Sequence, residues 1–189
     1  MFNTARRSIA TLIIFVWLLA NLSGLWAVGF FTSQAQEQSS MAPDAPVRED
    51  RDVLLLFAHP HCPCFAASLK SFAEIVRSAG DQQRAEIIFV RPDDVASGWE
   101  RTPSWDAAMA IPGVRVSCDT KGERAKGLGA TTSGQVLYID AGGAVRFRGG
   151  ITRPGSHAGD NVGRRSLINL LNGQDAEQNE TKVYGCLLY

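Results

Sequence analysis

Hydrophobic residues along this chain gather in blocks that are separated by polar segments. The longest block, residues 9–31, contains no charged residue. At about 1.5 Å of rise per residue, a helix of this length can cross a hydrocarbon core of roughly 30 Å. Arg6 and Arg7 precede the block, and the next basic residue is Arg48. The positive-inside rule therefore predicts a cytoplasmic N-terminus and an exported remainder of the chain.

Residues 9–31 can also be interpreted as a cleaved signal peptide, because small residues follow the block with cleavage-site spacing. The block exceeds the roughly 7 to 15 apolar residues usual in such peptides, which favours a retained anchor. Both interpretations export the rest of the chain. We expect a cytoplasmic stub with the anchor or signal segment at 1–31, a flexible polar linker at 32–52, a domain at 53–173, and a tail carrying Cys186 at 174–189.

Periodicity in the exported part predicts an α/β fold. Val53–Ala58 is a wholly apolar run typical of a buried strand, and Phe65–Ala79 has its apolar residues on one helical stripe. A second apolar run at 85–90 completes a right-handed crossover between parallel strands. Further elements expected are a helical stretch at 121–128, a strand at 114–118, a glycine-turn hairpin of strands 135–140 and 144–148, and a last helix capped by Asp160 that ends near 172–173. Residues 91–111 are interrupted by Pro92, Gly98 and Pro103 and receive no assignment, although 105–110 could hold a short helix.

Composition excludes several kinds of function. The 19 Lys and Arg residues balance the 19 Asp and Glu residues, so no global charge attracts a polyanion, and we expect no nucleic acid partner. Hydrophobic residues make up 45% of the chain, which fits a globular core rather than wholesale disorder. Four cysteines are too few for a disulfide scaffold but are enough for redox or metal chemistry.

Cys62 and Cys64 lie one residue apart in the sequence HPHCPC, between the first predicted strand and its helix. Pro63 suits the first turn of that helix, which puts both thiols at the helix N-terminus, where the partial positive charge favours the thiolate. A disulfide between residues i and i+2 closes a strained ring and is reduced easily. We expect a reactive pair that is presented to partners at the surface.

Cys186 belongs to an apolar C-terminal patch, which predicts that the terminus docks back onto the domain. From there Cys186 can reach the helix start and act as a resolving thiol for Cys62 or Cys64. The four cysteines allow three complete pairings, and the sequence leaves all three open. Cys118 ends a predicted strand and is expected to be a buried structural residue.

The three histidines lie outside any core pattern. His59 and His61 flank the cysteine pair, and His157 lies in a glycine-rich loop. Imidazole beside a thiol can lower the thiol pKa or carry protons, and imidazole with thiolate is also a soft metal site suited to copper or zinc. Redox and metal chemistry are therefore both open at this stage.

These features resemble the thioredoxin-like superfamily over about residues 53–173. The segments that carry the resemblance are HPHCPC, GATTSGQVLYID, FRGGITRPGSHAGDN and the terminal VYGC. Membrane-anchored thiol–disulfide proteins of bacteria are the most similar group, and the combination looks like their RedB-type members. The resemblance implies a thioredoxin-like mixed sheet flanked by helices, an oxidoreductase acting on thiols or disulfides of exported proteins, no cofactor, and a single-pass protein of the bacterial inner membrane with its C-terminal domain in the periplasm.

Two departures from the family pattern affect the site. One residue separates the cysteines here where the family has two, so aligning Cys64 with the second family cysteine puts His61 where the first should be. Ser133 and Gly134 stand where the family has Thr and a cis-proline. Gly134 can adopt backbone angles that let a partner's backbone approach the thiols. We expect His61, Pro63, Ser133 and Gly134 to support the cysteines.

Copper binding or delivery is the alternative function. Sco-type copper chaperones, which are also anchored and thioredoxin-like, join a cysteine pair to a distant histidine. The corresponding ligands here would be Cys62, Cys64 and His157. The cysteines of those chaperones are separated by three residues and these by one, which favours thiol redox chemistry.

Overall fold

The computed structural model describes residues 51–80, 83–155 and 157–189. The predicted anchor or signal segment, and all of the predicted linker up to residue 50, lie outside these described residues. Within the described ranges, no helix has both the length and the apolar character that a membrane crossing requires.

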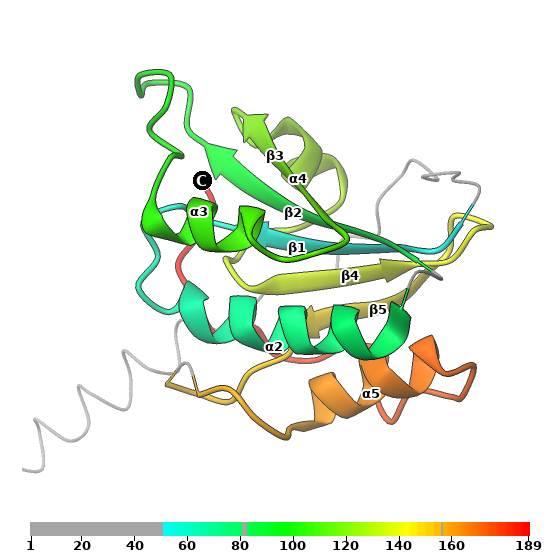
Figure 1. The fold of residues 1–189 in the computed structure, drawn as a ribbon. Coiled ribbons are helices and arrows are strands. Elements are labelled where there is room, and N and C mark those ends of the chain that lie inside the picture. Colours follow the sequence, from blue (N-terminus) through cyan, green and yellow to red (C-terminus); the bar gives the residue numbers. More distant parts are fainter. Residues whose placement is uncertain (1–50, 81–82, 156) are drawn as a thin grey trace, which may run out of the picture. The chain divides into compact units, whose positions relative to one another are not determined.

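A five-stranded mixed sheet forms the centre of the domain, with the strand order β3-β2-β1-β4-β5 (Figure 1). β1 (Val53–Ala58) lies in the middle and is parallel to β2 (Arg84–Arg91), which is parallel to β3 (Val114–Thr120). On the other side, β4 (Gln135–Ile139) is antiparallel to β1, and β5 (Val145–Gly150) is antiparallel to β4. The predicted parallel crossover and the predicted hairpin are both confirmed.

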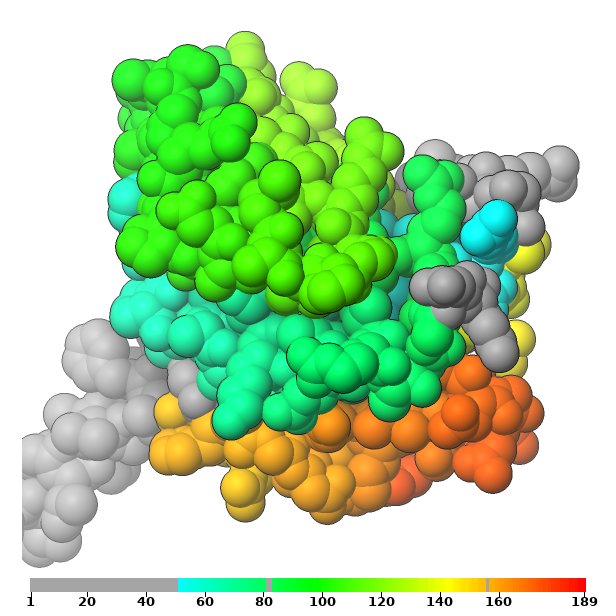
Figure 2. Space-filling model, viewed as in Figure 1, coloured from blue at the N-terminus to red at the C-terminus, as the bar shows by residue number. Residues whose placement is uncertain are grey.

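Helices cover both faces of this sheet. α2 (Phe65–Ala79), α3 (Pro103–Met109) and α5 (Val162–Leu171) pack against one face, where Figure 2 shows them as adjacent bands. α4 (Glu123–Gly127) and the C-terminal Leu188 cover the other face. A mixed five-stranded sheet flanked in this way is a thioredoxin-like α/β fold, as the sequence predicts.

β1 is buried along its whole length. Alternate side chains of the strand enter the two hydrophobic clusters, with Leu54, Leu56 and Ala58 on the α2 side and Val53, Leu55 and Phe57 on the α4 side. Because both faces are covered, the strand needs no polar alternation, and its sequence is a continuous apolar run. The buried end of β1 at Ala58 therefore fixes where the following segment begins.

The start of α5 differs from the prediction by one residue. Asn161, not Asp160, is the N-cap, and its side-chain oxygen accepts the Arg164 N–H at 3.0 Å. The Asn161 amide also donates to the Ile151 carbonyl at 2.9 Å, which an ionised carboxylate cannot do. Asp160 instead pairs with Arg165, at 2.8 Å.

α4 begins two residues later than predicted. Lys121 and Gly122 both have a φ of 66°, a left-handed conformation that cannot belong to a right-handed helix. The helix therefore spans five residues instead of the predicted segment at 121–128.

Asp52, at the end of the predicted linker, already contacts the sheet. Its carboxylate accepts hydrogen bonds from the Tyr138 hydroxyl and, at 2.9 Å, from the Ala141 N–H. Its carbonyl accepts the Arg84 N–H at 2.8 Å. Burial, and then the bond to Asp52, raise the pKa of Tyr138 above its ordinary value. Asp52 thereby fixes the chain where it enters β1.

Candidate active site

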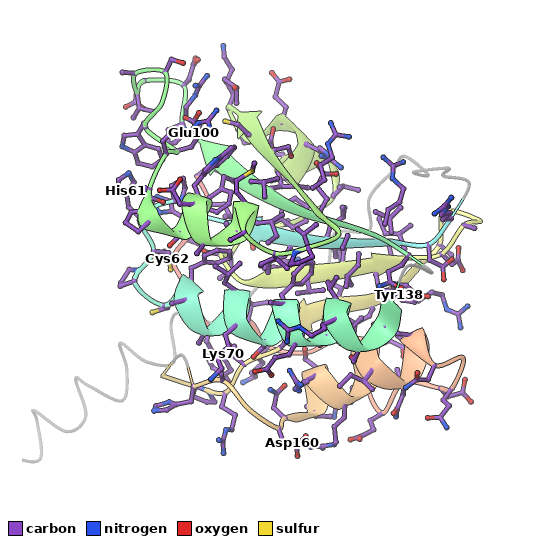
Figure 3. The ribbon with its side chains drawn as sticks, viewed as in Figure 1. His61, Cys62, Lys70, Glu100, Tyr138 and Asp160 are labelled. Carbon is purple, nitrogen blue, oxygen red and sulfur yellow. The ribbon has the colours of Figure 1, made fainter. Side chains whose placement is uncertain are left out.

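The HPHCPC segment connects the end of β1 to the start of α2, and Figure 3 shows His61 and Cys62 there, at the opposite end of the sheet from Tyr138. The Cys62 N–H donates to the His59 carbonyl at 3.0 Å, and the Cys62 carbonyl accepts the Phe65 N–H at 3.2 Å. Cys64 is the N-cap of α2. Pro63 therefore precedes the cap rather than lying in the first turn as predicted, because this tight turn comes before the helix begins.

Cys62 is the most enclosed of the cysteines, with an exposed fraction of 4%. The prediction that both thiols are presented at the surface is wrong for Cys62, while Cys64 is half-buried. Burial by itself raises the pKa of Cys62. Hydrogen bonds from the thiol and backbone of Cys186, from the Ser133 hydroxyl and from the Cys64 backbone outweigh burial and hold this pKa below 9.0.

Cys186 is the partner thiol in this contact. Burial, the hydrogen bond that it donates to Cys62, and the negative charges on Cys62 and Cys64 raise the pKa of Cys186 to about 12. When the pair loses one proton, the remaining proton therefore stays on Cys186, and the charge develops on Cys62. Of the two sulfurs in this contact, the arrangement stabilises the thiolate of Cys62.

The C-terminal tail reaches the site by pairing with the loop before β4. The Ser133 N–H donates to the Cys186 carbonyl at 2.8 Å, and the Leu188 N–H donates to the Thr131 carbonyl at 2.9 Å. A Cβ on Gly185 would lie 2.0 Å from the Ser133 oxygen, so this close approach requires glycine. Leu188 is fully buried. The terminus docks back as the sequence predicts.

Ser133 contacts the Cys62 sulfur, and Gly134 follows Ser133 in the chain. The Ser133 hydroxyl accepts the His59 N–H at 3.0 Å and donates to Cys62. Gly134 has a φ of +92° and donates its N–H to the Phe57 carbonyl at 2.8 Å. The sequence suggested that a partner's backbone approaches here. In the structure, a Cβ on Gly134 would lie 4.0 Å from the carbonyl oxygen of Tyr184, in the chain's own tail.

Trp99 is a residue of the site that the sequence analysis missed. Its ring centroid lies 4.4 Å from that of His61 and 5.5 Å from that of His59, and its carbonyl contacts His61 Nε2 at 3.1 Å. The Thr102 hydroxyl donates to the Pro60 carbonyl at 3.2 Å, so the loop between β2 and α3 covers the HPHCPC segment. Figure 3 shows Glu100 of this loop at the same end of the sheet as His61.

The histidines of the cysteine loop are involved in packing. His61 lies against Trp99, and its N–H donates to His59 Nδ1 at 3.3 Å. Burial, followed by the positive charge of His61, lowers the pKa of His59 below 6.5. His59 is therefore a neutral ring near pH 7.

The three ligands expected for copper binding, Cys62, Cys64 and His157, are not gathered at one place. His157 lies in the loop before α5, where Nδ1 contacts the Pro154 carbonyl at 3.1 Å. Among the residues that the structure describes, no three His, Cys, Asp or Glu side chains are gathered so that they could hold a metal ion. Cys62, Cys64 and His157 thus do not form a binding group here.

Cys118 stands apart from this site, on β3 beside Phe89 of β2. It is half-buried rather than fully buried. Burial and the charge of Glu100 raise its pKa, which keeps the thiol protonated. Its raised pKa makes Cys118 a suitable internal reference for Cys62.

Comparison with solved structures supports the fold. No protein-family model matches the chain, and no curated protein matches it. A hypothetical protein from Sinorhizobium meliloti is 16% identical, with a TM-score of 0.59 over 74% of this chain and 79% of that one. An uncharacterized conserved protein from Geobacillus kaustophilus is 20% identical, with a TM-score of 0.58 over 75% and 78%. Both share the fold of this chain.

Thioredoxin-like proteins are also among the similar structures. A secreted disulfide oxidoreductase from Mycobacterium tuberculosis is 14% identical, with a TM-score of 0.48 over 66% of this chain and 83% of that one. The strand order and the placement of the helices define the fold as thioredoxin-like α/β, and the cysteine loop lies between its central strand and the following helix.

Proposed function

We propose that this protein exchanges disulfides with exported proteins and that the Cys62 sulfur is the nucleophile. The observation that carries the proposal is the set of hydrogen bonds to this sulfur from Cys186, Ser133 and the Cys64 backbone, which stabilise a thiolate in a buried position. A structural cysteine in an apolar environment stays protonated and inert. Cys62 is buried as well, but the hydrogen bonds to its sulfur favour the thiolate.

The reaction consists of two exchanges. The Cys62 thiolate attacks one sulfur of a partner disulfide, so a Cys62–partner bond forms, the partner disulfide breaks, and one partner sulfur leaves as a thiolate. A second cysteine of this chain then attacks the Cys62 sulfur and releases the other partner sulfur. Two electrons pass to the partner, and the chain ends with an internal disulfide. The reverse sequence oxidises a partner dithiol.

We place this chemistry on the outer side of the bacterial inner membrane, with residues 9–31 as a single-pass anchor. The support is the charge-free apolar block and the absence of basic residues between it and Arg48. Disulfide exchange on protein partners also suits an oxidising compartment. Protease added to intact spheroplasts should digest the C-terminal domain, and a domain protected until the membrane is dissolved would contradict this location.

The reaction itself can be tested with an oxidised peptide that contains one disulfide. Reduced full-length protein should release peptide thiols, and Cys62→Ser should abolish the release, because the pKa of Cys62 is lowered whereas those of Cys118 and Cys186 are raised. Cys118→Ser is the matched control and should react as the wild type does. Release by Cys62→Ser at the wild-type rate would overturn the proposal.

A further inference from the structure

Two sulfurs from opposite ends of the described chain meet in the site. Cys62 follows β1, Cys186 lies three residues before the C-terminus, and their side chains are hydrogen-bonded. Only Pro63 separates Cys64 from Cys62 in the sequence, but the group of Cys64 that bonds to the Cys62 sulfur is its backbone N–H. Among the other cysteines, it is therefore Cys186 whose thiol is hydrogen-bonded to the Cys62 sulfur.

Contacts on both sides of Cys186 hold the tail in this place. Before it, Gly185 packs so closely on the Ser133 carbonyl that a Cβ at this position would lie 2.0 Å from the carbonyl oxygen. After it, Leu188 is fully buried under the sheet, and the Tyr189 hydroxyl donates to the Ala130 carbonyl at 3.1 Å. The Lys126 ammonium lies 4.9 Å from the centre of the Tyr189 ring. Such a set of contacts fixes Cys186 rather than leaving it on a loose end.

We infer that Cys186, and not Cys64, is the resolving thiol, so that Cys62–Cys186 is the disulfide formed in each reaction. This inference rests on the proposed function. In the mixed disulfide, the Cys186 thiolate attacks the Cys62 sulfur, the Cys62–Cys186 bond forms, and the Cys62–partner bond breaks with the electron pair leaving on the partner sulfur. The proton of Cys186 passes to the solvent or to the departing thiolate.

The state of Cys62 decides when Cys186 becomes reactive. In the reduced protein the Cys62 thiolate accepts the Cys186 proton in a hydrogen bond and repels a second negative charge. Once Cys62 is bonded to a partner it carries no charge, and both of these effects disappear. Cys186 can then lose its proton and attack, so resolution follows the first exchange and does not compete with it.

The tail also controls access to Cys62. The Cys62 sulfur is enclosed and contacts Cys186, so a partner sulfur has to take the place that Cys186 now occupies. The tail therefore moves aside when the partner binds, and its return to the Thr131–Ser133 edge brings Cys186 back to Cys62. Release of the partner is thus coupled to redocking of the tail.

The test uses the reduced full-length protein, oxidised glutathione and acid quenching, with intact-protein mass spectrometry as the readout. Wild type and Cys64→Ser should lose two thiols with only a transient glutathione adduct. Cys186→Ser should accumulate a glutathione adduct on Cys62, with release slowed about tenfold or more, since the intramolecular attack is lost. Accumulation in Cys64→Ser and rapid release in Cys186→Ser would overturn the inference.

A second variant acts on the tail without changing a thiol. Gly185→Ala brings a methyl group against the Ser133 carbonyl, so the tail redocks poorly and release should again slow about tenfold, equivalent to roughly 1.4 kcal/mol. Gly127→Ala, at a position with open space around the new methyl group, should leave release unchanged. Wild-type release by Gly185→Ala would contradict the role of the docked tail.

Failure of the inference is distinguishable from failure of the proposed function. If Cys62→Ser forms the adduct and releases glutathione as fast as wild type, the nucleophile has been misassigned and the proposed function fails. If Cys62→Ser is inert while Cys186→Ser releases glutathione normally, the function stands and the resolving thiol is a different cysteine.

Discussion

The thiol of Cys186 donates a hydrogen bond to the sulfur of Cys62. This contact lowers the pKa of Cys62 and raises the pKa of Cys186. The thiolate absorbance assigned to Cys62 by difference from Cys62→Ser should therefore appear below pH 9.0. Cys186→Ala removes the donor while the sulfur stays buried, so the pKa of Cys62 should rise. Cys186→Ser keeps a donor and should stay near the wild type.

Cys118→Ser is the control for this titration, because the raised pKa of Cys118 puts its own titration at higher pH. The variant should leave the low-pH thiolate absorbance in place. If Cys186→Ala and Cys186→Ser had the same thiolate titration as the wild type, the hydrogen bond would have no influence on Cys62.

Ser133→Ala should affect both reactivity and stability. The hydroxyl donates to the Cys62 sulfur and accepts the His59 N–H at 3.0 Å, so its loss should raise the pKa of Cys62 and lower the free energy of unfolding by about 1 kcal/mol. Thiolate titration and urea unfolding measure the two effects. Ser97→Ala, at an exposed position, should change neither quantity. An unchanged Cys62 titration in Ser133→Ala would exclude Ser133 from the site.

Gly134 and Gly98 form a matched pair for measuring crowding beside the active site. Both have a φ of +92°, but a Cβ on Gly134 would lie 2.7 Å from the Ser68 Oγ, while one on Gly98 would meet nothing within 4 Å. Gly98→Ala should lower the free energy of unfolding by about 1 kcal/mol through backbone strain, and Gly134→Ala by at least about 1 kcal/mol more.

Ser68→Ala provides the check on that difference, because it removes the crowding oxygen from helix α2. In the Ser68→Ala background, the two glycine substitutions should lower the free energy of unfolding by similar amounts in urea titrations. A Gly134→Ala penalty that persists undiminished would locate the strain elsewhere.

An ion pair with a buried carboxylate, away from the site, should make stability depend on pH. Glu86 accepts two hydrogen bonds from Arg124, at 2.7 and 2.8 Å, and one from Ser117 at 2.6 Å. Burial raises the pKa of Glu86, but these hydrogen bonds outweigh it and hold the pKa below 4.5. The stabilisation is therefore complete above pH 4.5 and is lost as the pH falls through the lowered pKa of the folded protein.

Glu86→Gln should lower the free energy of unfolding at neutral pH by about 1 to 3 kcal/mol, and the difference from wild type should shrink as the pH falls below 4.5. Asp93→Asn is the control, since its pair with Lys121 at 3.0 Å is exposed and should contribute little. A Glu86→Gln penalty that is the same at low and neutral pH would show that the charge of Glu86 is not involved.

Much of the fold could be predicted because its signals are local. The apolar run of β1 and the helical stripe of α2 give the exact bounds that the structure has. The predicted helix starts were wrong where a single backbone angle or side-chain hydrogen bond determines the first residue. These are the starts of α4, after Lys121, and of α5, after Asn161. Such effects depend on neighbours in space that a periodic pattern does not contain.

The site was less predictable for the same reason. The sequence indicated the reactive loop, but the pKa of Cys62 is set by Ser133 and Cys186, which reach it only through the pairing of the tail with the loop before β4. Trp99 lies in a segment broken by Pro92 and Gly98, where no periodicity marks a role. Its packing on the histidines became visible only in three dimensions.

The most direct measurement is a time-resolved peptide map of the reduced full-length protein after mixing with oxidised glutathione without oxygen. We expect glutathione to appear first on the Cys62 peptide and then to be replaced by a Cys62–Cys186 cross-link. A Cys62 peptide that stays a free thiol while glutathione collects on other cysteines would contradict the assignment of Cys62 as the nucleophile.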